Sequence, residues 1–264
     1  MDTRIETSGA QTLNKVPQVT LIFWIVKMMS TSVGETAADF LTSDLKLGLA
    51  LTTALMGLLL IAALAAQFRT RRYTPGVYWL AVVLISTVGS LITDALVDLY
   101  GVALTTTSAA FGIALVAVFA LWYASERSLS IHGIVTRRRE GFYWLAILFT
   151  FALGTAAGDL VAEGLDLGYA VSALIYGGLI ALVTLAFLAW KLNAVLAFWL
   201  AYVLTRPFGA SIGDFLSQPA ANGGLGLGTV WTSVVFLLAI LAAVGYMSLT
   251  RFDAIDTPQE GAPA

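Results

Sequence analysis

Four aspartates occupy the same position in four similar stretches of an otherwise apolar chain. In each stretch an aromatic residue precedes a tryptophan, a glycine stands ten residues after that tryptophan, and an aspartate stands five residues after the glycine. The aspartates are Asp39, Asp94, Asp159 and Asp214. Carboxylate oxygens suit hard cations such as Mg²⁺, Mn²⁺ or Ca²⁺, and clustered carboxylates can also exchange protons. The pattern therefore favours a shared cation or proton site, although structural capping of helix ends is the alternative interpretation of the aspartates.

The other members of the pattern have structural interpretations. Small residues let membrane helices approach closely, so the glycines are interpreted as helix-packing positions. These glycines are Gly34, Gly89, Gly154 and Gly209. Indole rings suit the boundary between lipid and water, so the tryptophans are interpreted as interface anchors. These tryptophans are Trp24, Trp79, Trp144 and Trp199.

Charged residues other than the aspartates distinguish the first and fourth stretches. Steps of four residues place side chains on one helix face, so Lys27 and Glu35 should share a polar stripe with Asp39. Glu35 could be a fifth ligand or a proton carrier, and Lys27 and Arg206 could be internal counter-charges. We expect Glu35 to pair with Arg206. Pro207 should kink its helix, and this kink could either act as a gate or simply position Arg206.

The composition of the chain indicates that these residues belong to a membrane protein. The 264-residue chain has a mean hydropathy of +0.87, with 59% hydrophobic and only 11% charged residues, whereas soluble domains have about 25% charged residues. The absence of cysteine excludes a disulfide scaffold, and a net charge of −2 with scattered basic residues disfavours nucleic acid as a partner. The sequence predicts an all-α polytopic membrane protein whose first partner is the lipid bilayer.

Eight apolar stretches are long enough to cross a bilayer, which needs about 20 residues per helix. They lie near residues 18–41, 48–68, 77–98, 103–124, 141–163, 169–190, 194–216 and 229–250. Eleven of the 14 basic residues lie in the tails or in the loops that follow even-numbered spans. The positive-inside rule therefore predicts that both termini are cytoplasmic.

The aspartate pattern divides the chain into four units of two helices each. Because two helices return the chain to the same side, all four aspartate-bearing helices should be parallel. We expect an N-terminal cytoplasmic tail, four repeats, of which the second includes a basic cytoplasmic loop, and a disordered C-terminal cytoplasmic tail. The corresponding ranges are 1–17, 18–76, 77–140, 141–193, 194–250 and 251–264.

This organisation resembles a bacterial family of integral membrane proteins built from four tandem two-helix repeats of unknown function. The resemblance covers residues 17–250 and is carried by the repeated motif, as in the segments 33–40 and 206–215. It implies the fold, the topology and a place in a bacterial cytoplasmic (inner) membrane, but no established activity.

Three classes of function are compatible with these residues. The preferred hypothesis is a cation transporter, with Mn²⁺ or Mg²⁺ as favoured substrate, coupled to protons or to the membrane potential. A structural or sensory membrane protein, in which the aspartates hold helices together, is the alternative. An intramembrane aspartyl enzyme is disfavoured because such a site needs two distinguished aspartates rather than four equivalent ones. The sequence leaves open whether the chain acts alone or as a homo-oligomer.

Overall fold

The computed structural model describes residues 14–253, whose regular elements are all helices. Eight of these helices are long α-helices, and they account for most of the described chain. They are α1 (Leu21–Asp39), α2 (Leu49–Arg69), α3 (Pro75–Asp94), α4 (Leu104–Glu126), α5 (Arg137–Asp159), α6 (Gly168–Trp190), α7 (Ala194–Ser217) and α8 (Thr229–Thr250). All eight are close to the spans expected from the sequence.

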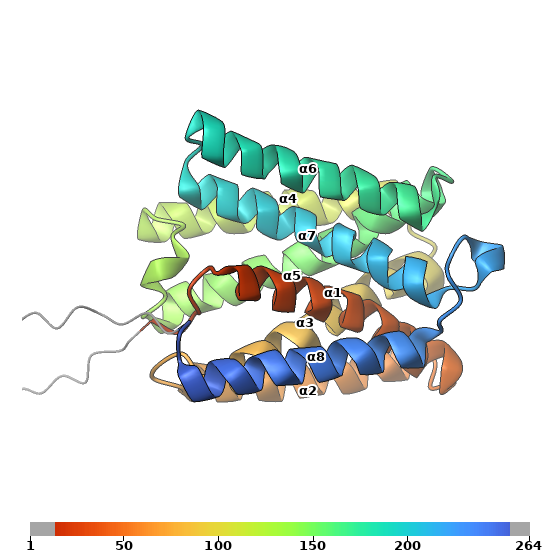
Figure 1. Ribbon diagram of the computed structural model, residues 1–264, viewed down its shortest axis with the longest axis horizontal. Coiled ribbons are helices and arrows are strands. Elements are labelled where there is room, and N and C mark those ends of the chain that lie inside the picture. Colours follow the sequence, from red (N-terminus) through yellow and green to blue (C-terminus); the bar gives the residue numbers. More distant parts are fainter. Residues whose placement is uncertain (1–13, 254–264) are drawn as a thin grey trace, which may run out of the picture.

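The odd-numbered helices form an inner ring. Helix α1 packs against α3 and α7, and α5 packs against the same two helices from the other side. The even-numbered helices lie outside this ring, with α2 on α3, α4 on α5, α6 on α7, and α8 on α1. Figure 1 shows α6 and α4 along one side of the bundle and α2 and α8 along the other. Each outer helix therefore packs on the inner helix of the following repeat, and α8 closes the ring.

The outer helices present their apolar side chains to the surroundings. In the most apolar stretch of α6 only 11% of residues are buried, whereas 61% are buried in the corresponding stretch of α3. A helix that is apolar on all sides and exposed in the folded chain requires lipid around it. The fold is therefore that of a multi-pass membrane protein.

Helix α1 differs from the other seven helices. Seven of the described helices are long and apolar enough to cross a membrane by themselves, and α1 is not among them. Its 19 residues include Lys27, Glu35 and Asp39. Because α1 is surrounded by α3, α7 and α8, it makes its polar contacts with protein rather than with lipid.

The helix boundaries differ from expectation at two kinds of position. Helix α5 begins at Arg137, where the Thr136 hydroxyl accepts a hydrogen bond from the backbone N–H of Arg139, so the arginine run forms a first helical turn rather than a loop. A π-helical turn follows three of the four aspartates. These turns are η1 (Phe40–Asp44), η2 (Ala95–Leu99) and η4 (Leu160–Gly164).

The segments expected to be terminal tails are partly buried. Lys15 and Val16, placed in the N-terminal tail, are 3% and 1% exposed, and Asp253, placed in the disordered C-terminal tail, is 1% exposed. The prediction of a disordered tail is therefore wrong for Asp253, whose carboxylate accepts a hydrogen bond from the hydroxyl of Tyr73 at 2.7 Å. The remaining tail residues, 1–13 and 254–264, lie outside the described residues.

Candidate functional site

The four repeat aspartates line a single cavity at one end of the inner ring. This cavity, which we call the acidic cavity, has a volume of about 440 Å³ and is open at one side. Glu35 lines it together with Asp39, Asp94, Asp159 and Asp214. Because every aspartate stands at the same end of its helix, the four inner helices run parallel. The aspartates thus face one shared space rather than two separate pairs.

On each inner helix, the residues that stand four, eight, twelve and sixteen positions before the aspartate lie along the ring axis, at increasing distance from the cavity. The first step reaches Glu35 on α1, Ser90 on α3 and Thr155 on α5. The guanidinium of Arg206, from α7, lies among these three side chains. Its Nη2 donates to Glu35 Oε2 at 2.8 Å, to Thr155 Oγ1 at 2.7 Å and to the hydroxyl of Ser90. Arg206 therefore ties the four inner helices together directly beneath the acidic cavity.

The expected pairing of Glu35 with Arg206 is present, and both side chains are buried. Arg206 is 0% and Glu35 6% exposed. Glu35 Oε2 also accepts a hydrogen bond from Ser90 at 3.1 Å, and Arg206 Nη1 donates to the backbone carbonyl of Thr31 at 3.3 Å. A buried ion pair is tolerable when additional hydrogen bonds satisfy its remaining donors and acceptors. This pair has several such bonds, although Arg206 Nε is buried without a partner among the described residues.

Lys27 lies farther from the cavity and does not contact the carboxylates. Its Nζ donates to the backbone carbonyl of Tyr202 at 2.7 Å and to the hydroxyl of Thr205. It also lies 4.1 Å from the centroid of the Tyr202 ring, which is a cation–π contact. Lys27 therefore connects α1 to α7, and its charge is balanced by oxygen dipoles and an aromatic face.

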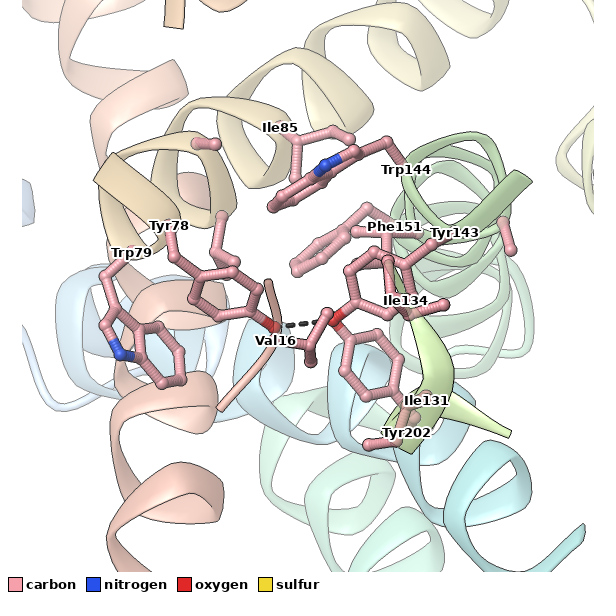
Figure 2. Packing of buried hydrophobic residues seen from close by; sticks show 14 of the residues in the cluster. Val16, Tyr78, Trp79, Ile85, Ile131, Ile134, Tyr143, Trp144, Phe151 and Tyr202 are labelled. Carbon is pink, nitrogen blue, oxygen red and sulfur yellow. Dashed lines mark hydrogen bonds between the residues drawn. The ribbon is translucent and has the colours of Figure 1, made fainter. Parts of the chain in front are cut away.

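Aromatic residues close the opposite end of the ring axis. Four steps of four residues back from the aspartates reach the first member of each aromatic–tryptophan pair, and all four side chains are buried. They are Phe23, Tyr78, Tyr143 and Phe198, and we call them the aromatic layer. The Tyr78 and Tyr143 hydroxyls form a hydrogen bond of 2.5 Å between the neighbouring helices α3 and α5 (Figure 2). This layer was not predicted from the sequence, although the spacing that groups Lys27 with Asp39 also connects these residues to the aspartates.

The tryptophans that follow these residues pack inside the bundle. Trp79, Trp144 and Trp199 are at most 5% exposed, and only Trp24 is half-buried. Trp79 Nε1 donates to the Tyr73 hydroxyl at 3.2 Å, and Trp199 Nε1 donates to the Leu129 carbonyl at 2.9 Å. An interface anchor must reach the lipid headgroups, and three of these four indoles do not. Trp79 and Trp199 instead join the inner helices to the loops at the aromatic end. Trp144 packs against Tyr78 on α3.

The glycines of the pattern lie where neighbouring inner helices are closest. A Cβ atom on Gly89 would lie 2.7 Å from Phe151 Cβ on α5, and one on Gly154 would lie 2.6 Å from Arg206 Cβ on α7. A Cβ on Gly34 would collide with Ser86 on α3, and one on Gly209 would collide with Thr31 on α1. Each glycine thus faces the inner helix of the next repeat, and the fourth faces the first.

Pro207 lies at one of these crossings. Its Cδ atom would be 3.0 Å from a Cβ on Gly154, and its Cβ atom would be 3.5 Å from one on Gly158. The proline ring therefore packs along a small-residue face of α5, directly beside Arg206. Of the two roles that the sequence left open, this contact supports the positioning of Arg206.

The carboxylates do not form a closed metal site. Among residues 14–253, no group of three or more histidine, aspartate or glutamate side chains is arranged to hold a metal ion. Asp39, Asp94 and Asp159 also make no side-chain capping hydrogen bond to the π-helical turns that they precede. Asp39 does accept one bond from Gln218 Nε2, at 3.4 Å. These carboxylates thus line an open cavity rather than a compact ligand cage.

A parallel ring of four repeated helices, with a carboxylate from each at one end, defines a class of tandem-repeat membrane proteins. The sequence profile described as Repeat of Unknown Function (DUF347) matches this chain four times, at residues 22–73, 77–128, 142–192 and 197–252. The chain therefore belongs to this repeat family. No curated protein and no solved structure matches it.

Proposed function

We propose that this protein is a cation transporter of the bacterial inner membrane, with the acidic cavity as its binding site. All eight helices cross the bilayer in this proposal, both termini are cytoplasmic, and the acidic cavity opens to the outside. The single observation that carries the proposal is the convergence of four repeat aspartates and Glu35 on one open cavity that ends at the buried Glu35–Arg206 pair.

The favoured substrate is a divalent cation that enters with its water shell. Mg²⁺ gives up water reluctantly and is often held by only one or two carboxylates and several waters. Seven acidic side chains line this cavity of about 440 Å³, because Asp98 and Glu163 join Glu35 and the four repeat aspartates. They suit such an ion better than a bare one, since no three of them form a compact ligand set. Mn²⁺ is the second choice, because its preferred ligands are also oxygens.

The Glu35–Arg206 pair is the step at which the cation would compete with protein charge. An ion that reaches Glu35 must weaken its 2.8 Å contact with Arg206. Arg206 would keep its bonds to Ser90 and Thr155, and would then oppose the positive charge of the ion. The membrane potential, worth about 2.3 kcal/mol per charge at 100 mV, or proton exchange on the carboxylates would drive passage.

Flux measurements on purified protein test this proposal. We expect a quadruple variant to take up Mg²⁺ or Mn²⁺ into proteoliposomes at least tenfold more slowly than the wild type. This variant combines Asp39→Asn, Asp94→Asn, Asp159→Asn and Asp214→Asn. The substitution keeps side-chain size and removes only the charge.

The matched control is Asp166→Asn, which makes the same substitution in a turn at the acidic end but does not alter the cavity lining. It should transport like the wild type. Uptake by the quadruple variant at the wild-type rate, with the protein still folded, would overturn the proposal.

A further inference from the structure

A short non-helical segment lies across the aromatic end of the ring axis. Residues 14–20, which we call the strap, precede α1, and Val16 within them is 1% exposed. Ile131 and Ile134, from the loop between α4 and α5, lie beside Val16. Figure 2 shows these three side chains next to the rings of Tyr78, Tyr143 and Tyr202. Two layers of side chains therefore close the aromatic end: the aromatic layer, and an aliphatic cover formed by Val16, Ile131 and Ile134.

Contacts with three separate parts of the chain hold the strap in place. The backbone N–H of Lys15 donates to the Ile134 carbonyl at 3.2 Å, and that of Gln18 donates to the Asp253 carbonyl at 2.8 Å. The backbone N–H of Tyr73 donates to the Asn14 carbonyl at 3.1 Å. These few bonds replace the continuous ladder of a helix, so the strap can detach without unfolding its neighbours.

One buried ion pair joins the strap to the bundle. Lys15 Nζ lies 2.7 Å from Glu140 Oε2, and the two side chains are 4% and 1% exposed. Gln67 Nε2 donates to the other Glu140 oxygen at 3.3 Å, and Lys15 also donates to the Phe68 carbonyl at 3.3 Å. The pair therefore connects the strap to the ends of both α2 and α5.

The two ends of the ring axis are unequal. The acidic cavity is open, whereas the aromatic end is covered by a segment that has few backbone bonds. A transporter exposes its site to the two sides in turn, and here the covered end must open for the second side. The inner helices cross at glycines that leave no space for a Cβ, so the strap is the element at this end that can move with least repacking.

We propose that the strap is the inner gate of this protein, held closed by the Lys15–Glu140 ion pair. This inference rests on the proposed transport function, because it assigns the second side of access to that same pathway. Detachment of the strap removes Val16 from the tyrosines and opens the aromatic layer to the cytoplasm. Reattachment restores the state in which only the acidic cavity is open.

Charge reversal across the ion pair tests the gate without a transport measurement. Lys15→Glu or Glu140→Lys alone places like charges together and should repel the strap. The double variant Lys15→Glu/Glu140→Lys restores opposite charges and should hold the strap closed again. Because the chain has no cysteine, single reporter cysteines can be introduced at Ile134, beneath the strap, and at Val82, one helical turn beyond Tyr78.

The readout is the rate at which a membrane-impermeant maleimide labels each reporter in inside-out vesicles. Both sites are 0% exposed, so the otherwise unaltered protein should label slowly. We expect each single charge reversal to speed labelling at both reporters at least tenfold, and the double variant to label within twofold of the unaltered protein. Arg138→Glu, which disrupts the exposed Arg138–Glu126 pair on the same side, should change neither rate.

Two labelling results would overturn the proposal. If Ile134→Cys becomes reactive while Val82→Cys stays protected, the strap is a cover that does not control the axis. If the double variant labels as fast as the single variants, the effect is loss of packing rather than release of the ion pair.

If neither reporter responds to charge reversal, a cross-linking experiment tests whether the strap must detach for cation uptake. Val16→Cys and Ile134→Cys, joined by a short bifunctional methanethiosulfonate that forms a disulfide with each cysteine, should abolish cation uptake, and a reducing agent that cleaves these disulfides should restore it. Unchanged uptake by the cross-linked protein would refute the gate. If none of the proteins transports cations but the labelling pattern holds, the gate stands and the proposed transport function fails.

Discussion

At the residue scale, the Glu35–Arg206 pair unites the polar part of the bundle. Arg206 contacts three inner helices besides its own, through Thr31 and Glu35 on α1, Ser90 on α3 and Thr155 on α5. Among the described residues Arg206 forms an ion pair with Glu35 alone, so these two side chains depend on each other. This dependence makes the pair both a structural link and the place where a competing cation would act.

Removal of both partners should destabilise the protein by less than the sum of the two single removals. We expect Arg206→Gln or Glu35→Gln alone to cost about 3–5 kcal/mol, because each leaves a buried charge without its counter-charge. The double variant should lose clearly less than the sum of the two single losses. Thermal unfolding in detergent would measure this difference.

The exposed pair Arg138–Glu126 provides the control for that comparison. Its atoms are 3.7 Å apart and the Arg138 side chain is 68% exposed, so Arg138→Gln should cost less than about 1 kcal/mol. Strictly additive losses at Glu35 and Arg206 would show that the two side chains do not interact.

At the scale of elements, the inner helices form a ring because each carries a small residue where the next helix crosses it. Gly34, Gly89, Gly154 and Gly209 each face the inner helix of the following repeat. The outer helices need no such residue because lipid covers much of their surface. The same glycine in each repeat thus produces a ring that closes on itself.

Addition of one methyl group at a crossing should be costly. In Gly154→Ala the new Cβ would lie 2.6 Å from Arg206 Cβ and 3.0 Å from Pro207 Cδ. Overpacking of this kind costs about 1–3 kcal/mol, so the thermal unfolding temperature in detergent should fall.

Gly57 on the outer helix α2 is the matched control. A Cβ there would have no atom within 4 Å. Gly57→Ala should therefore be neutral or stabilising by up to about 1 kcal/mol, since alanine favours the helix. Equal changes at Gly154 and Gly57 would contradict close packing of the inner ring.

At the scale of the whole molecule, the two ends of the described chain meet at the aromatic end of the bundle. Gln18 donates to the Asp253 backbone, and the Asp253 carboxylate accepts a bond from the Tyr73 hydroxyl. Burial raises the pKa of Asp253, although the bonds from Tyr73 and from its own backbone N–H act in the opposite direction. The C-terminal segment thus docks most firmly when Asp253 carries a proton.

This pKa shift predicts how stability depends on pH. Because the folded state retains the Asp253 proton to higher pH than the unfolded state, its stabilising contribution is complete below the ordinary aspartate pKa of about 4 and falls as pH rises through the raised pKa. Asp253→Asn should remove this decline. Tyr73→Phe should extend it to higher pH, because it deletes a bond that favours the carboxylate. The measurement is the unfolding temperature of the wild type and of Asp253→Asn across this pH range. If both proteins show the same pH dependence, the assignment to Asp253 is wrong.

The sequence by itself determined the helices, the fourfold repeat and the faces that point inward. These features follow from local periodicity, since apolar runs define spans and steps of four residues define a helix face. Thus the polar stripe from Lys27 to Asp39 and the pairing of Glu35 with Arg206 could be predicted. The aromatic layer has the same spacing, but its residues are apolar like most of the chain, so their place in the pattern does not by itself show that they meet.

Only the tertiary structure decided which helices are neighbours and what covers the aromatic end. The order of the ring and the convergence of four aspartates on one cavity depend on contacts between distant repeats. Lys15 and Glu140, separated by 125 residues, form the buried pair that holds the strap. A tail with ordinary composition gives no local sign of such burial, because a single ion pair and three backbone bonds require partners that only the folded bundle brings together.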